Sequence, residues 1–172
     1  MIISFNPEIQ STPSLPLGTH IDIVPSPIHL LEHGFVTPVI IKTSSISGAP
    51  PLSCPIKSVL VMALFDTGAS RTCISDIIAS ALALNPVGFS KFYTASGKEV
   101  FADYAVDIEF PGAGLRGCEN MKVGSCNMPY NHTLPDAQRM VYSNFGVLIG
   151  RDIMSRWNIV WNGPSSSVFI SE

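Results

Sequence analysis

Charge is scarce in this chain of 172 residues. Only 13% of the residues are charged, the formal net charge is -3, and 46% of the residues are hydrophobic. A protein that binds nucleic acid or an anionic membrane surface usually carries a basic patch, and this composition leaves little material for one. We therefore expect a partner that is not a polyanion, with no nucleic acid and no membrane among the partners.

Long hydrophobic runs are also missing. No apolar stretch approaches the roughly 20 residues that a membrane-spanning helix needs. The first ten residues, MIISFNPEIQ, lack the basic start and the long apolar middle of a secretory signal. The chain is therefore predicted to be soluble and cytoplasmic, and its length predicts one hydrophobic core.

Cysteine is rare as well. The chain has four cysteines, Cys54, Cys73, Cys118 and Cys126. They are too few for a disulfide-dense scaffold, and their irregular spacing matches no common zinc pattern, so reduced thiols are expected and neither a metal nor a cofactor is predicted. Two alternatives stay open: a metal site that combines Cys118, Cys126 and His132, and a disulfide between Cys118 and Cys126 in an oxidising compartment.

The N-terminal part of the chain is rich in proline, serine and threonine. Its prolines are Pro7, Pro13, Pro16, Pro25 and Pro27. This composition favours extended chain over packed elements. Residues 1–32 are therefore predicted to form a Pro-rich arm, and residues 33–172 to form the folded domain.

Two stretches near the start of this domain have the composition of strands. Residues 35–43, FVTPVIIKT, are rich in β-branched residues, and residues 55–65, PIKSVLVMALF, form a nearly continuous apolar run. The second stretch is predicted to be buried on both faces.

A long hairpin is predicted further along the chain. Residues 90–110 alternate well enough to form two antiparallel strands joined at TASGKE, residues 94–99, where Gly97 permits a tight turn. Residues 111–140 contain several Gly, Pro and Asn residues and are predicted to be an irregular insertion.

Two segments follow the order strand, turn, short helix. In the first, the apolar run ends at Asp66, and a helix is predicted over 76–84 with Ser75 as its N-cap. In the second, residues 145–157, FGVLIGRDIMSRW, lead from an apolar strand through a glycine into a short helix. This similarity suggests internal pseudo-symmetry. A terminal hairpin is predicted around Asn162-Gly163.

The motifs of these two units resemble a known family. LFDTGAS at residues 64–70, followed about 80 residues later by VLIGRDIM at residues 147–154, is similar to the pattern of the retropepsin-like, or retroviral-type, aspartic proteases. The resemblance covers residues 35–172 apart from the 111–140 insertion. It implies an all-β fold: a closed barrel with a flap hairpin and one or two short helices.

The resemblance also implies an aspartic endopeptidase without metal or cofactor, acting on a peptide or protein substrate. Asp66 would be catalytic, with Thr67 and Gly68 as its support. Two carboxylates that share a proton are needed to activate a water molecule and protonate the peptide group. The chain has one Asp-Thr-Gly triplet, so the second carboxylate is expected from Asp66 of another copy in a homodimer.

Substrate-binding residues are expected in two places. Ala69 and Ser70 lie directly after the triplet and leave room beside the carboxylates. The hairpin tip would close over a bound peptide as a flap, through Thr94, Ala95, Ser96 and Gly97. The alternative for the hairpin tip is an ordinary exposed turn.

Other interpretations of the same residues stay open. The fold could serve a non-catalytic peptide-binding or assembly module. Arg151 and Asp152 are expected to form a structural ion pair or cap. Retroviral members commonly carry an acid shortly after the alanine of the triplet, and here Ser70 and Arg71 occupy those positions, so Arg151 needs a different partner. Cys73 is expected to be a packed thiol and not a nucleophile.

Overall fold

The computed structural model describes residues 2–4, 21–24, 34–44, 58–94, 97–111, 115–128, 130–135, 138, 144–162 and 167–172. The strands of the main sheet are β3 (Val36–Thr43), β4 (Ser58–Phe65), β5 (Cys73–Ser75), β6 (Gly88–Thr94), β7 (Gly97–Glu109), β8 (Cys118–Cys126) and β9 (Phe145–Ile149). Two short helices are α2 (Asp76–Ala81) and α4 (Arg151–Met154). No helix in these ranges has the length and apolar character to span a membrane.

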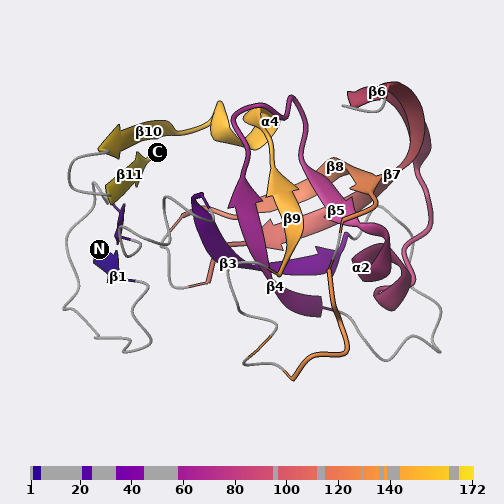
Figure 1. Ribbon diagram of the computed structural model, residues 1–172, viewed down its shortest axis with the longest axis horizontal. Coiled ribbons are helices and arrows are strands. Elements are labelled where there is room, and N and C mark those ends of the chain that lie inside the picture. Colours follow the sequence, from indigo (N-terminus) through magenta and orange to yellow (C-terminus); the bar gives the residue numbers. More distant parts are fainter. Residues whose placement is uncertain are drawn as a thin grey trace.

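The main sheet closes on itself. Its strand order is β3-β4-β9-β5-β8-β7-β6, and β3 also pairs with β7. The strands from β3 round to β7 therefore form a closed barrel, while β6 extends from β7 as the outer arm of a hairpin (Figure 1). The expected all-β closed barrel with short helices is confirmed.

The barrel interior is filled by the inward residues of the strands. Val39 and Ile41 of β3, Val61 and Ala63 of β4, and Ile149 of β9 are almost completely buried. The expectation that the whole of residues 55–65 is buried on both faces is wrong for its described first part, because Leu60 is 46% exposed. Burial on both faces begins only where β4 runs beside β9, at Met62.

Helix α2 begins as expected but ends early. The Ser75 hydroxyl accepts a hydrogen bond from the backbone N–H of Ile77 at 3.3 Å, as an N-cap does. The helix ends at Ala81 and not at residue 84, because the chain turns at Ala83, which has a φ of 48°. Leu82 is fully buried in the core beside this turn.

The expectation of an irregular segment over 111–140 is wrong for residues 118–126, which form β8. This strand pairs with β7 on one side and β5 on the other, so it is part of the barrel wall. Polar residues on its outer side and a shift in register near Asn120, which has a φ of 52°, hide the alternation in the sequence.

A second sheet joins the two ends of the chain. It contains β1 (Ile2–Ser4), β2 (Ile21–Val24), β10 (Asn158–Asn162) and β11 (Ser167–Ser171) in the order β1-β2-β11-β10. The predicted terminal hairpin is confirmed as β10 and β11, which lie beside the N-terminal strands in Figure 1. These pieces of the predicted arm are therefore paired strands, and the rest of residues 1–32 lies outside the described residues.

Candidate active site

Asp66 lies at the end of two parallel strands. It directly follows β4, which runs parallel to β9 with Phe65 opposite Ile149. The backbone N–H of Asp66 donates to the carbonyl oxygen of Ile149 at 3.0 Å. The pairing of β4 and β9 therefore fixes the position from which the Asp66 side chain starts.

The Asp66 carboxylate turns back onto its own loop. Its Oδ1 atom accepts hydrogen bonds from the backbone N–H groups of Gly68, at 2.8 Å, and Ala69, at 3.2 Å. A Cβ atom on Gly68 would lie 3.0 Å from this oxygen, so a side chain there would crowd the carboxylate. Within the described residues, no hydrogen bond or ion pair engages the other oxygen, Oδ2. The carboxylate is thus oriented by its loop and keeps one oxygen available.

The rest of this loop is open in the single chain. Thr67, Gly68 and Ser70 are exposed, whereas Asp66 and Ala69 are partly buried. A cavity of about 600 Å³ opens elsewhere, between β7, the start of β8 and Trp157, and no residue of the Asp66 loop lines it.

Arg151 holds the triplet through its backbone. The Nη1 atom of Arg151 donates to the carbonyl oxygens of Thr67, at 2.7 Å, and Gly68, at 3.2 Å, and the backbone N–H of Arg151 donates to the carbonyl oxygen of Ala69 at 3.0 Å. Arg151 therefore needs no acid after the triplet. Within the described residues its contacts are structural, as expected, but they are hydrogen bonds to carbonyl groups and not an ion pair or a helix cap.

Asp152 fixes the far end of the same loop. Its two carboxylate oxygens accept from the backbone N–H of Thr72, at 3.0 and 2.9 Å, and one of them also accepts from the Thr72 hydroxyl at 2.8 Å. The Thr72 hydroxyl in turn accepts from the backbone N–H of Gly150 at 3.0 Å. The sequence analysis missed Thr72, since a buried threonine 80 residues from its partner leaves no local signal.

The predicted hairpin is present as β6 and β7, which pair from Gly88 opposite Asp103 to Thr94 opposite Gly97. Gly97 has a φ of +127°, a conformation that favours glycine. Ala95 and Ser96 lie outside the described residues. Figure 1 shows the free end of the hairpin on the same side of the barrel as the loop between β4 and β5. The predicted site residues thus form two groups, the loop 66–70 and the hairpin end.

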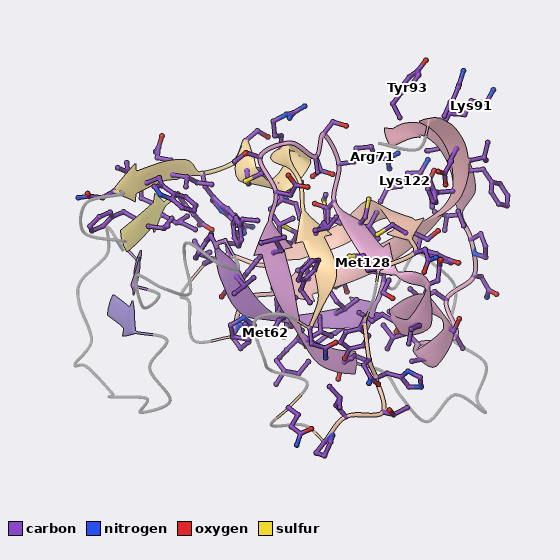
Figure 2. The ribbon with its side chains drawn as sticks, in the orientation of Figure 1. Met62, Arg71, Lys91, Tyr93, Lys122 and Met128 are labelled. Atoms are coloured by element: carbon purple, nitrogen blue, oxygen red, sulfur yellow. The ribbon has the colours of Figure 1, made fainter. Side chains whose placement is uncertain are left out.

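The two groups are joined at the base of the hairpin by a cluster that the sequence analysis missed. Asp103 of β7 is fully buried, and its Oδ2 atom accepts from the Ser90 hydroxyl at 2.5 Å and from Lys122 Nζ at 2.8 Å. Arg71 Nη1 lies 3.5 Å from Asp103 Oδ1 and donates to Ser90 Oγ at 2.9 Å. Figure 2 shows the Arg71 and Lys122 side chains next to each other under the hairpin, while Lys91 and Tyr93 point away.

Electrostatics keep Asp103 ionised despite its burial. Burial alone raises the pKa of the Asp103 carboxyl, but the hydrogen bonds from Lys122 and Ser90 and the charge of Arg71 outweigh it, so the pKa lies below its usual value. The sequence gives no simple signal for this residue, because Asp103 lies on the face of β7 opposite to its core residues Val106 and Ile108.

The described cysteines are free thiols, as expected. Cys118 and Cys126 stand at opposite ends of β8. At about 3.4 Å per residue they are roughly 27 Å apart, so they cannot form the disulfide or share a metal ion. No group of His, Cys, Asp or Glu side chains within the described ranges could hold a metal ion. Cys73 is partly buried, and its Sγ atom lies 3.7 Å from the carbonyl oxygen of Arg71.

No protein-family model matches this sequence, and no curated protein matches it. Among solved structures, the chain is similar to the crystal structure of a retropepsin-like aspartic protease from Rickettsia conorii. The identity is 15%, the match covers 88% of this chain and 98% of that chain, and the TM-score is 0.46. Nothing about activity follows from this match.

Proposed function

We propose that the protein is an aspartic endopeptidase that hydrolyses peptide bonds with a pair of Asp66 carboxylates, one from each copy of a homodimer. The surroundings of Asp66 carry this proposal. Its carboxylate is oriented by two backbone N–H groups through one oxygen, and the other oxygen has no partner within the described residues. Because Asp66 is only partly buried and its loop is open, this oxygen is accessible to water and to a second carboxylate.

The chemistry follows from bringing two such carboxylates together. Two like charges at close range cannot both stay ionised, so the pair holds one proton between them. The ionised carboxylate then takes a proton from the attacking water, and the protonated one gives its proton to the peptide group. No metal ion is needed for these steps.

The neighbouring residues support this arrangement. Gly68 and Ala69 are small, so a second loop and a substrate chain have room to approach. Thr67 is exposed and can contact the partner's loop. Ala69 and Ser70 would line the bound peptide, and the hairpin end from Thr94 to Gly97 would close over it. A non-catalytic peptide-binding or assembly module could use the same groove, but it has no need for paired carboxylates.

The test is cleavage of a mixed peptide library by the purified protein, read by mass spectrometry. Wild type should cut, and Asp66→Asn should lose at least about 1000-fold in kcat/KM, because no base remains to activate water. Asp76→Asn changes an exposed aspartate in the first turn of α2 and serves as the matched control, with activity close to wild type. Binding of peptides without cleavage by the wild type would favour the non-catalytic module.

A further inference from the structure

The cluster around Asp103 connects four separate segments at one point. Asp103 belongs to β7, Ser90 to β6, Lys122 to β8, and Arg71 to the loop that carries Asp66. Both strands of the hairpin are therefore joined, through side chains, to the barrel wall and to this loop. Main-chain pairing already connects the loop to β8, because Gly124 lies opposite Asp103 and its N–H donates to the carbonyl oxygen of Thr72 at 3.0 Å, and the side-chain cluster adds a direct link from the loop to both strands of the hairpin.

The Arg71 guanidinium contacts both the hairpin base and β8. Its Nη1 atom donates to Ser90 and faces Asp103, while its Nη2 atom donates to the carbonyl oxygen of Lys122 at 3.3 Å. The Arg71 side chain is 28% exposed and the Lys122 side chain 54%, whereas that of Asp103 is 0% exposed. The buried carboxylate is thus the common partner of two cations that reach it from the surface.

The loop from Asp66 to Thr72 is held from two sides. Arg151 and Asp152, both in α4, hold its carbonyl groups and its end at Thr72. The hairpin holds it through Arg71, which directly precedes Thr72. A change at the hairpin base therefore reaches the Asp66 loop within a few residues.

We propose that Asp103 is a positioning residue, which fixes the base of the β6–β7 hairpin to the loop that carries Asp66. Its importance for catalysis rests on the proposed function, but the mechanical coupling does not. Through this coupling the hairpin end and the Asp66 carboxylate keep a defined relative position, as closure over a peptide requires. The negative charge of Asp103 strengthens this link, because an ionised carboxylate binds the Arg71 and Lys122 cations and the Ser90 hydroxyl more strongly than a neutral group would.

The experiment is hydrogen exchange of backbone amides, measured by NMR without peptide, in wild type and Asp103→Asn. The Val87 amide, which donates to the carbonyl oxygen of Asp103 at 2.8 Å, reports on the hairpin base. The Thr72 amide reports on the loop, since it is held by Asp152. Both amides should exchange at least about tenfold faster in Asp103→Asn, while the amides of β3 should change little.

Four further variants make the test specific. Arg71→Gln alone should accelerate exchange at Thr72, and the double variant should add little to either single change, because both act through one contact. Ser90→Ala keeps every charge and gives the same two readouts if Asp103→Asn does not fold. Glu109→Gln is the matched control, since it breaks the exposed ion pair with Lys42 elsewhere on the barrel and should leave Thr72 unchanged.

Equal acceleration at Val87, Thr72 and the β3 amides would overturn the proposal, because it would show only a general loss of stability. Acceleration at Val87 with Thr72 unchanged would also overturn it, because the hairpin would then move without the loop. Since no substrate is present, these outcomes are independent of whether the wild type cleaves peptides.

Discussion

Two aspartates near the same loop have opposite surroundings. Asp66 is partly exposed, and among the described residues its carboxylate binds only backbone N–H groups of its own turn. Asp103 is fully buried and is engaged by a lysine, a serine and an arginine. The first arrangement leaves a carboxylate available for reaction, while the second keeps a carboxylate ionised and fixed. A catalytic assignment based on burial or charge contacts alone would select Asp103, whereas the proposed function assigns the chemistry to Asp66.

The lowered pKa of Asp103 predicts a pH-dependent stability difference. A carboxyl group whose pKa falls on folding stabilises the folded state above its unfolded pKa and loses that contribution as the pH falls through the folded pKa. Asp103→Asn should therefore lower the free energy of unfolding by roughly 3 kcal/mol at pH 7. The difference should shrink as the pH drops below 3.8, the ordinary pKa, towards the lower pKa of the folded state.

Urea denaturation at pH 7, pH 4 and pH 2 measures this difference. Asp76→Asn, at an exposed aspartate, should change the unfolding free energy by less than about 1 kcal/mol at pH 7. A difference for Asp103→Asn that stays constant from pH 7 to pH 2 would mean that the charge of Asp103 contributes nothing.

At the scale of elements, the sequence predicts strands, turns and helices that depend on neighbouring residues, but not the contacts between distant segments. The strand, Asp-Thr-Gly turn and helix around Asp66 follow from apolar periodicity and a cap at Ser75, and the unit around Arg151 follows in the same way. The strand β8 was missed because its outward residues are polar and its register shifts near Asn120. The pairing of β2 with β11 and the contact of Asp152 with Thr72 join residues far apart in the chain, and no local pattern encodes such contacts.

The junction between β9 and α4 should be intolerant of any side chain at Gly150. A Cβ atom there would lie 2.3 Å from the carbonyl carbon of Arg71 and 2.7 Å from the backbone nitrogen of Thr72. Gly150→Ala should therefore push the Asp66 loop away from α4 and cost about 3 kcal/mol or more in unfolding free energy. Thermal unfolding and urea denaturation measure the loss.

Gly146→Ala is the matched comparison within β9. Its Cβ atom would lie 2.5 Å from the Cδ1 atom of Ile78, the flexible end of a side chain, and 3.2 Å from the ring of Tyr130. Because a side-chain end can move more easily than backbone, this substitution should cost about 1 to 2 kcal/mol. Equal losses at Gly146 and Gly150 would contradict the importance of the backbone contact between Gly150 and Arg71.

A substitution at the end of the hairpin is expected to reduce activity much more than stability. Gly97 has a φ of +127° but open space around its Cβ position, so Gly97→Val strains the backbone without a clash. If the hairpin closes over a peptide, this change should lower kcat/KM about tenfold or more, with a loss of only about 1 to 2 kcal/mol in unfolding free energy. Gly34→Ala, at another positive φ but ahead of β3, should cost stability without this loss of activity. Unchanged kcat/KM in Gly97→Val would make the hairpin end an ordinary turn.

At the scale of the whole molecule, one chain supplies one Asp-Thr-Gly loop, and that loop is open. The barrel places Asp66 at the end of β4 and β9, and α4 and the Asp103 cluster hold its loop from two sides. These supports orient a single carboxylate, so the proposed chemistry needs a second copy to bring its own Asp66. Activity is then a property of the assembly, and its concentration dependence is the most direct readout.

Mixing experiments test this requirement. When wild-type chains exchange freely with a fourfold excess of Asp66→Asn chains, about one fifth of the wild-type chains should pair with another wild-type chain, so the activity per wild-type chain should fall to about one fifth. The same excess of Asp76→Asn chains, which keep Asp66, should raise the total activity instead. Specific activity of the wild type should also fall on dilution below the dimer dissociation constant, measured in parallel by light scattering. Activity that is unaffected by the Asp66→Asn excess and by dilution would show that one chain completes the site by itself, and the homodimer proposal would then be wrong.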